Sequence, residues 1–148
     1  MKKIIIWGLI FIVLGFILGE FIFSDKIELI KKLKKGDTYY FLEEGVYKDY
    51  KSIENNLSDI GKNIIVKKDN KYHVYVGITK DLEVLEKIKK IYKDKNINIY
   101  PKEIIFSSRF FSANVDQFDL LIKDTKDIDQ ILTIEEVVLS NYEEIIKK

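Results

Sequence analysis

The longest apolar stretch of the chain runs from Ile4 to Phe23, and Glu20 is the one charged residue within it. At 1.5 Å per residue, a helix of about 20 residues spans roughly 30 Å, the thickness of the hydrocarbon core of a bilayer. A cleaved signal peptide would have a shorter apolar region followed by a small-x-small cleavage site, and no such site follows this run. We therefore expect residues 1–24 to form an uncleaved transmembrane anchor, whose residues 4–23 contact membrane lipid.

The charges that flank this run leave the membrane orientation open. Lys2 and Lys3 precede the run, whereas more lysines follow it in the charged linker 25–37. If these lysines are simply counted, the positive-inside rule predicts that the rest of the chain stays in the cytoplasm. However, a short basic start before an apolar run is also typical of an export signal, and long domains often translocate despite flanking charge. We expect a single-pass protein of the cell membrane with an extracytoplasmic C-terminal domain.

Beyond the linker, the spacing of apolar residues predicts alternating strands and helices. Four consecutive aromatic or aliphatic residues favour a strand over 38–44, which Gly45 ends. Asp49 suits a helix N-cap, and Gly61 suits the C′ position of the helix between them. The apolar residues of that helix recur at helical spacing: Tyr50, Ile53, Leu57 and Ile60.

The next segment predicts a hairpin, a second helix and a fourth strand. Strands over 63–67 and 71–78 are separated by the turn pair Asp69-Asn70. Thr79 or Asp81 then caps a helix with the apolar stripe Leu82, Leu85, Ile88 and Tyr92. The last strand covers 97–102, and Pro101 within it suggests an edge position or a strand end.

The resulting order is strand, helix, strand, strand, helix, strand, which is the split βαβ (ferredoxin-like) arrangement. It predicts an α+β fold with a four-stranded antiparallel sheet, two helices on one face and the other face open. An internal repeat supports this order. Tyr40-x4-Gly45-Val46-x-Lys48-Asp49 matches Tyr72-x4-Gly77-Ile78-x-Lys80-Asp81 at an offset of 32 residues.

Residues 105–148 predict a C-terminal helical hairpin. One apolar stripe comprises Phe111, Val115, Phe118 and Ile122, and the other comprises Ile131, Ile134, Val138, Tyr142 and Ile145. The pattern leaves two possibilities open: the hairpin packs on the preceding domain, or it binds a partner.

The segment 38–104 resembles a SPOR domain, the sporulation-related repeat. The resemblance is carried by the stretches 39–47 (YYFLEEGVY) and 71–78 (KYHVYVGI), in which an aromatic start leads to a glycine followed by an aliphatic residue. With an anchor ahead of it, such a domain is similar to membrane-tethered sporulation and division proteins of Gram-positive bacteria, including stage II sporulation protein B-like proteins. Glu43 stands where the family often has glutamine, and His73 and Tyr75 stand where it often has arginines.

The resemblance implies a non-catalytic module that binds peptidoglycan. Such a module recognises glycan strands stripped of their stem peptides, at sites of cell division or sporulation. The alternative is a protein–protein interaction module of a membrane-associated division or sporulation complex that has lost glycan binding.

Strand alternation places the candidate ligand-binding residues on the open face of the sheet. If Leu42 and Val76 face the helices, the opposite face carries six candidates: Phe41, Glu43, His73, Tyr75, Tyr100 and Lys102. Aromatic rings beside hydrogen-bonding groups suit a sugar, because rings stack on apolar C–H surfaces while polar groups bind hydroxyls. The alternative is that the helical hairpin covers this face and makes these aromatic residues part of the core.

Composition argues against nucleic-acid binding, metal binding and catalysis. The 25 basic and 24 acidic residues give a net charge of +1, which offers no electrostatic reason to expect nucleic acid, although the RNA-recognition fold shares this topology. The absence of cysteine removes thiolate sites, and His73 is the only histidine, so we expect neither a metal nor another cofactor. Glu43 and Glu44 are adjacent on a strand and point to opposite faces, so they do not form a catalytic pair. We expect no enzymatic activity.

Overall fold

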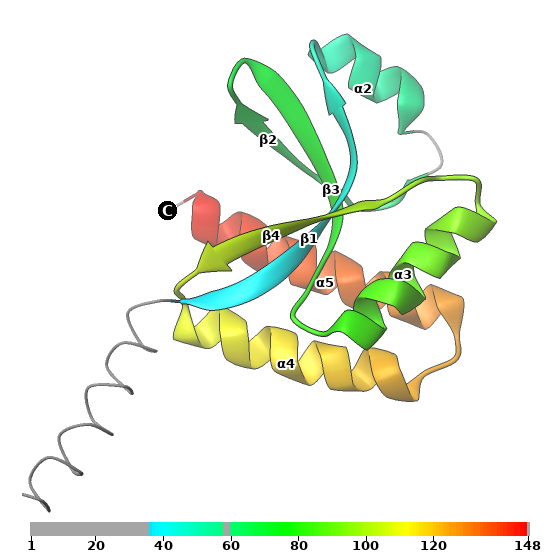
Figure 1. Cartoon of the computed structure of the whole chain (residues 1–148), viewed down its shortest axis with the longest axis vertical. Helices are drawn as coiled ribbons and strands as arrows, with labels where there is room; N and C mark the ends of the chain where they lie inside the picture. The colour runs from blue at the N-terminus through cyan, green and yellow to red at the C-terminus, as the bar shows by residue number, and fades with distance from the viewer. Residues whose placement is uncertain (1–35, 58–59, 148) are drawn as a thin grey trace, which may run out of the picture. The chain divides into compact units, whose positions relative to one another are not determined.

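The computed structural model describes residues 36–57 and 60–147. The predicted anchor and nearly all of the predicted linker therefore lie outside the described residues. Within the described ranges, no helix is both long enough and apolar enough to cross a bilayer. Residues Asp37–Lys148 form one compact unit (Figure 1).

The elements of this unit follow the predicted order, including the two helices predicted at the end (Figure 1). They are β1 (Asp37–Tyr47), α2 (Tyr50–Asn56), β2 (Ile64–Lys68), β3 (Lys71–Thr79), α3 (Leu82–Asp94), β4 (Tyr100–Phe106), α4 (Arg109–Asp124) and α5 (Ile128–Ile146). The strands form a four-stranded antiparallel sheet in the order β2-β3-β1-β4. The predicted α+β class and antiparallel sheet are confirmed, and the strand order is that of the split βαβ arrangement.

Local sequence explains where several elements begin and turn. The side chains of Asp49 and Asp81 accept hydrogen bonds from backbone N–H groups in the first turns of α2 and α3, as N-caps do. Asp69 and Asn70 both have positive φ angles, 51° and 57°, which suit the tight turn between β2 and β3.

Four predicted boundaries are wrong. The last strand, β4, ends at Phe106 rather than at residue 102. β1 does not end at Gly45 but continues to Tyr47, because Gly45 still pairs with Val74 of β3. α2 ends at Asn56 rather than near Gly61. β4 begins at Tyr100 rather than at residue 97, because the preceding residues close α3.

The end of α3 shows why the fourth strand starts late. Asn96 has a φ of 61°, its N–H donates to the carbonyl of Lys93, and the N–H of Ile97 donates to the carbonyl of Tyr92. These two bonds form the Schellman motif that commonly ends a helix. Ile97 is therefore part of a helix cap and is not free to begin a strand.

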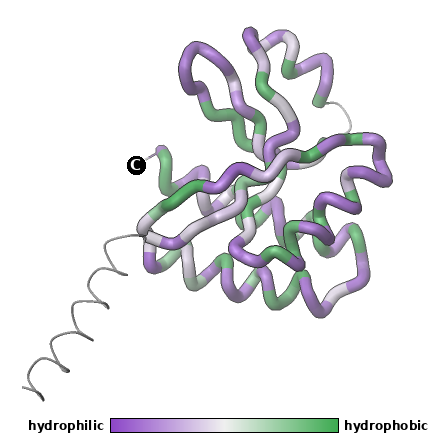
Figure 2. Tube along the Cα trace, viewed as in Figure 1, coloured by the Kyte–Doolittle hydropathy of each residue, from purple (hydrophilic) through white to green (hydrophobic). Residues whose placement is uncertain are grey.

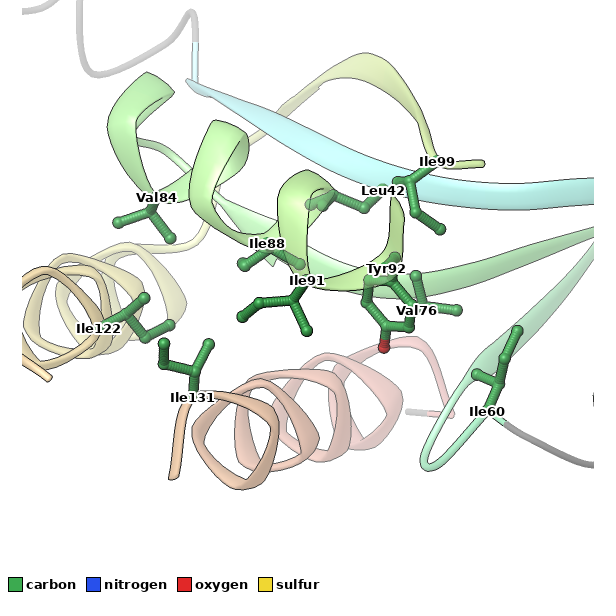
Figure 3. Close-up of a cluster of buried hydrophobic side chains, with 10 residues drawn as sticks. All are labelled: Leu42, Ile60, Val76, Val84, Ile88, Ile91, Tyr92, Ile99, Ile122 and Ile131. Carbon is green, nitrogen blue, oxygen red and sulfur yellow. The ribbon is translucent and has the colours of Figure 1, made fainter. Parts of the chain in front are cut away.

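The first core cluster lies between the sheet and α3 (Figure 3). Leu42 of β1 and Val76 of β3 contribute from the sheet, and four buried residues of α3 pack against them: Val84, Ile88, Ile91 and Tyr92. Ile122 of α4 and Ile131 of α5 reach the same cluster (Figure 3). The C-terminal helices are thus integral to this core.

The second core cluster lies on the opposite side of β1. Tyr39 and Phe41 of β1 pack with Tyr75 and Ile78 of β3, and α4 and α5 cover them with Phe111, Val115, Val138 and Leu139. The prediction that this face of the sheet is open is therefore wrong. The alternative, that the helical hairpin covers it, is confirmed.

Two irregularities interrupt the pairing of β1 with β3. Val76 has no partner between the pairs Leu42↔Gly77 and Glu43↔Tyr75, and Glu44 has none between Glu43↔Tyr75 and Gly45↔Val74. Such bulges increase local twist and redirect side chains. Here they flank Glu43, the residue around which the candidate site is built.

Candidate functional site: a buried carboxylate at the end of the sheet

The structure brings the six predicted site residues together on one face of the sheet. Glu43 pairs with Tyr75 on one neighbouring strand and with Tyr100 on the other. Phe41 pairs with Lys102. Strand alternation therefore predicted correctly which residues share a face, although not how exposed each one is.

Glu43 is the centre of this group. Its carboxylate is 3% exposed, one oxygen lies 2.7 Å from Nδ1 of His73, and the other lies 3.6 Å from Nζ of Lys102. A buried carboxylate needs such partners, because removing it from water without compensation is costly. We call Glu43, His73, Tyr100 and Lys102 the Glu43 cluster.

Phe41 and Tyr75 do not belong to an accessible surface. Phe41 is 1% exposed, and its ring lies 5.3 Å from that of Tyr75 and 4.9 Å from that of Tyr142 on α5. The predicted position of Phe41 and Tyr75 on an open face is wrong, because α5 covers this part of the sheet. These rings contribute to the core and offer no stacking surface to a ligand.

The Glu43 cluster itself reaches the surface. Tyr100 is 57% exposed, and the side chains of Lys102 and His73 are 53% and 22% exposed. Val46, which pairs with His73, is also exposed. The cluster therefore presents an exposed tyrosine and two nitrogen-bearing side chains around a carboxylate that is held in place.

A groove adjoins Tyr100. It has a volume of about 650 Å³ and lies between the second half of α3 and the segment leading into β4. Its lining carries three lysines and two acidic residues: Lys89, Lys90, Lys93, Glu86 and Asp94. Tyr100 belongs both to this lining and to the Glu43 cluster.

Two further buried carboxyl groups were not predicted from the sequence. Glu135 of α5 accepts a hydrogen bond of 2.9 Å from the N–H of Ile78, and Asp119 of α4 accepts from the hydroxyl of Thr79 and the N–H of Lys80. β2 pairs with β3 only as far as Tyr75, so these carboxyl groups bond the part of β3 that has no strand on that side. They fasten the C-terminal helices to the sheet.

Burial dominates the protonation of both groups. It raises the pKa of Glu135 to about 8, and the hydrogen bond from Ile78 only partly opposes this. Burial also raises the pKa of Asp119, against the opposing hydrogen bonds from Thr79 and Lys80. Both lie inside the fold, so they are structural rather than ligand-binding groups. Among the described residues, no cluster of three or more potential ligands could hold a metal ion.

Ser112 and Lys80 resemble a nucleophile–base pair but have the wrong electrostatics for that chemistry. Nζ of Lys80 lies 2.8 Å from Oγ of Ser112 and 2.8 Å from a carboxylate oxygen of Asp116. Burial lowers the pKa of Lys80, but the hydrogen bond to Asp116 and the charges of Asp116 and Asp37 outweigh burial and raise it. Lys80 therefore stays protonated at neutral pH and cannot accept a proton from Ser112.

Comparison with protein-family models, curated proteins and solved structures finds no match for this chain.

Proposed function

We propose that this chain is a membrane-anchored, non-catalytic module that binds the glycan strands of peptidoglycan through the Glu43 cluster and the adjoining groove. The supporting observation is that four of the six residues singled out for this role form one cluster that reaches the surface. In that cluster, Tyr100 is exposed beside a carboxylate held by His73 and Lys102.

The chemistry of the cluster suits a sugar. An exposed tyrosine ring can stack on the apolar face of a pyranose while its hydroxyl group hydrogen-bonds. Lys102 and His73 can donate hydrogen bonds to hydroxyl or acetamido oxygens. One carboxylate oxygen of Glu43 lies 2.7 Å from Nδ1 of His73, and the other lies 3.6 Å from Nζ of Lys102 in an ion pair. These contacts orient both side chains before a ligand arrives, which reduces the entropy lost on binding.

The charges that line the groove favour glycan strands from which the stem peptides have been removed. Removing the stem peptides leaves a free carboxylate on the lactyl group of each muramic acid residue. Lys89, Lys90 and Lys93 outnumber Glu86 and Asp94 in the groove, so its balance of charge favours an anionic polysaccharide. This accords with the preference for stripped glycan that a SPOR-like domain implies.

The test uses the full-length chain in mild detergent and measures co-sedimentation with purified cell-wall sacculi, before and after amidase treatment. We expect tighter binding to stripped sacculi, and weaker binding at higher salt because salt screens charges at the surface. Tyr100→Ala should weaken binding roughly tenfold, the equivalent of about 1.4 kcal/mol from one stacked ring. Lys102→Ala should have a smaller effect in the same direction.

The matched controls are Tyr50→Ala and Lys68→Ala. Tyr50 is 51% exposed, close to the exposure of Tyr100, but lies on α2, and Lys68 is an exposed lysine of β2. Both controls should bind as the unchanged chain does. Failure of the unchanged chain to sediment with either preparation, or equal losses in Tyr100→Ala and Tyr50→Ala, would refute the proposal.

A second candidate function is a protein-interaction module of a membrane-associated division or sporulation complex. A separate observation favours it, because α4 exposes large apolar side chains, including Phe110 at 74% and Leu120 at 63%. This surface does not include the Glu43 cluster, so both functions are compatible with one chain.

A further inference from the structure

α4 carries a second apolar stripe that faces away from the core. Its buried face consists of Phe111, Val115, Asp119 and Ile122. The outward stripe follows helical spacing of three or four residues and consists of Phe110, Ala113, Gln117, Leu120 and Leu121, all exposed. We call these five residues the α4 stripe.

The fold leaves the α4 stripe uncovered. Within the described part of the chain, α4 contacts α3, α5 and β3 through its other faces. Figure 1 shows α4 at the margin of the unit, and Figure 2 shows hydrophobic and hydrophilic residues alternating along it. A helix with apolar residues on both sides is typical of one that packs on its own core and also on a partner.

The ends of α4 carry opposite charges. Arg109, the only arginine of the chain, is the first residue of α4, and Asp124 is the last. Both are exposed, and neither forms an ion pair with another described residue. At 1.5 Å per residue they lie roughly 22 Å apart, one at each end of the α4 stripe.

We propose that the α4 stripe binds the α4 stripe of a second copy of this chain, with the two helices antiparallel around a two-fold axis at Gln117. This arrangement places Arg109 of each copy beside Asp124 of the other, so that two Arg109–Asp124 ion pairs form across the axis. A parallel arrangement would instead place like charges together at both ends, which is unfavourable.

The sizes of the apolar residues fit the same register. Around an axis at Gln117, Ala113 of one copy lies opposite Leu121 of the other. A small residue facing a large one lets the two helices approach closely. Phe110 lies opposite the last turn of the second α4, where the methylene carbons of long side chains can cover its ring.

The predicted strength of this contact is modest. One helix packed on another buries less than the roughly 1,200 Å² typical of stable interfaces. Two copies tethered in one membrane have a raised effective concentration, which would populate such a contact. We therefore expect the pair to form between full-length chains in a bilayer.

Disulfide cross-linking tests the pairing, because the chain has no cysteine of its own. Full-length Gln117→Cys is reconstituted in lipid vesicles and oxidised. Two cysteines on the axis come within the Cα separation of less than about 7 Å that a disulfide requires. We expect rapid formation of a covalent dimer.

Gln130→Cys is the matched control. Gln130 is an exposed glutamine of α5 that accepts a hydrogen bond from Thr125, beyond the end of α4. Thr125 lies eight residues along the chain from Gln117, or roughly 12 Å of helix from the axis, so two such cysteines lie too far apart to join. Equal cross-linking of both variants would indicate association through the predicted anchor or random collision, and would overturn the proposal.

A charge exchange tests the antiparallel register. In the Gln117→Cys background, Arg109→Asp should slow cross-linking roughly tenfold, because two exposed ion pairs are replaced by repulsion. Adding Asp124→Arg should restore the original rate, since the exchanged charges again pair across the axis. Failure of the double change to restore the rate, with both variants folded by circular dichroism, would overturn the register.

The pairing is independent of the proposed glycan binding. Tyr100→Ala should leave cross-linking unchanged, and Arg109→Asp should leave the intrinsic affinity for a short glycan fragment unchanged. Cross-linking therefore tests the pairing alone, and glycan affinity tests the proposed function alone.

Discussion

Glu135 is positioned by the same helical spacing that builds the core around it. It follows Ile131 by four residues and precedes Val138 by three, and both of these are buried. Gly77 makes room for it, because a Cβ added at Gly77 would lie only 2.9 Å from Oε2 of Glu135. The absence of a side chain on β3 thus allows a carboxyl group of α5 to reach the backbone of Ile78.

This carboxyl group should make stability depend on pH. In the folded chain the pKa of Glu135 is about 8, against an ordinary value of 4.5, so the folded state holds a proton that the unfolded state releases. The contribution of Glu135 to stability should therefore be complete near pH 4.5 and below, fall as the pH rises towards 8, and level off above it. Each pKa unit corresponds to about 1.4 kcal/mol, so the total fall would be a few kcal/mol.

Glu135→Gln should remove most of this dependence while keeping an acceptor for the N–H of Ile78. The measurement is chemical denaturation between pH 5 and 8, with Glu136→Gln, an exposed neighbour, as the control. Asp119, whose pKa is also raised by burial, would leave a residual slope of the same sign. A Glu135→Gln profile as steep as that of the unchanged chain would show that Glu135 does not hold the proton.

The residues of the candidate site illustrate what the sequence could specify. Alternation along β1 and β3 correctly grouped Phe41, Glu43, His73 and Tyr75, because a strand has a fixed period of two. It could not distinguish Phe41 from Tyr100, since both lie on that face. Their different exposure depends on where α5 covers the sheet, which is a property of tertiary packing.

At the level of elements, α4 and α5 determine which side chains of the sheet are buried. Their apolar stripes predicted two amphipathic helices, and helices are found at Arg109–Asp124 and Ile128–Ile146. A stripe specifies that a face will be buried, but not against what. Asp119 and Glu135 could have indicated that α4 and α5 pack on the sheet, because a carboxyl group within an apolar stripe requires a hydrogen-bond donor elsewhere in the fold.

Tyr142 should contribute strongly to the attachment of α5. Its ring packs against those of Phe41, Phe106 and Phe111, with ring centroids 4.9, 5.9 and 5.7 Å apart. Tyr142→Ala should lower the free energy of unfolding by about 3 kcal/mol, as truncation of a packed aromatic side chain does. Tyr142→Phe keeps the ring and should cost less than about 1 kcal/mol. Equal costs for the two variants in denaturant titrations would contradict the packing role of the ring.

On the scale of the whole unit Asp37–Lys148, helices cover β1 and β3 on both faces, whereas the side chains of the edge strand β4 are mostly exposed. α3 packs on one face together with Ile122 of α4 and Ile131 of α5, and other residues of α4 and α5 cover the opposite face. The Glu43 cluster is a place where side chains of the sheet reach the surface beside a groove. The strand order could be predicted because the hairpin turn and the repeated strand-to-helix unit are local signals. The covering of the second face could not, because it depends on contacts distant in sequence.

The unit Asp37–Lys148 has its own core, so it should fold without the residues that precede it. Both hydrophobic clusters, the caps of α2 and α3, and the buried bonds of Asp119 and Glu135 lie within it. A chain that begins at Gly36 should therefore unfold cooperatively, with a midpoint in denaturant close to that of the full-length chain.

The same truncation tests whether glycan binding and membrane attachment depend on different parts of the chain. The shortened chain should keep its affinity for stripped glycan, because Tyr100, Lys102 and the groove are retained, but it should leave the membrane fraction of cells. Its Gln117→Cys form should cross-link more slowly than the full-length form at equal total concentration, since tethering no longer concentrates the copies. A shortened chain that still fractionates with membranes would show that Asp37–Lys148 itself binds lipid or a membrane protein. The predicted anchor would then not be the sole attachment.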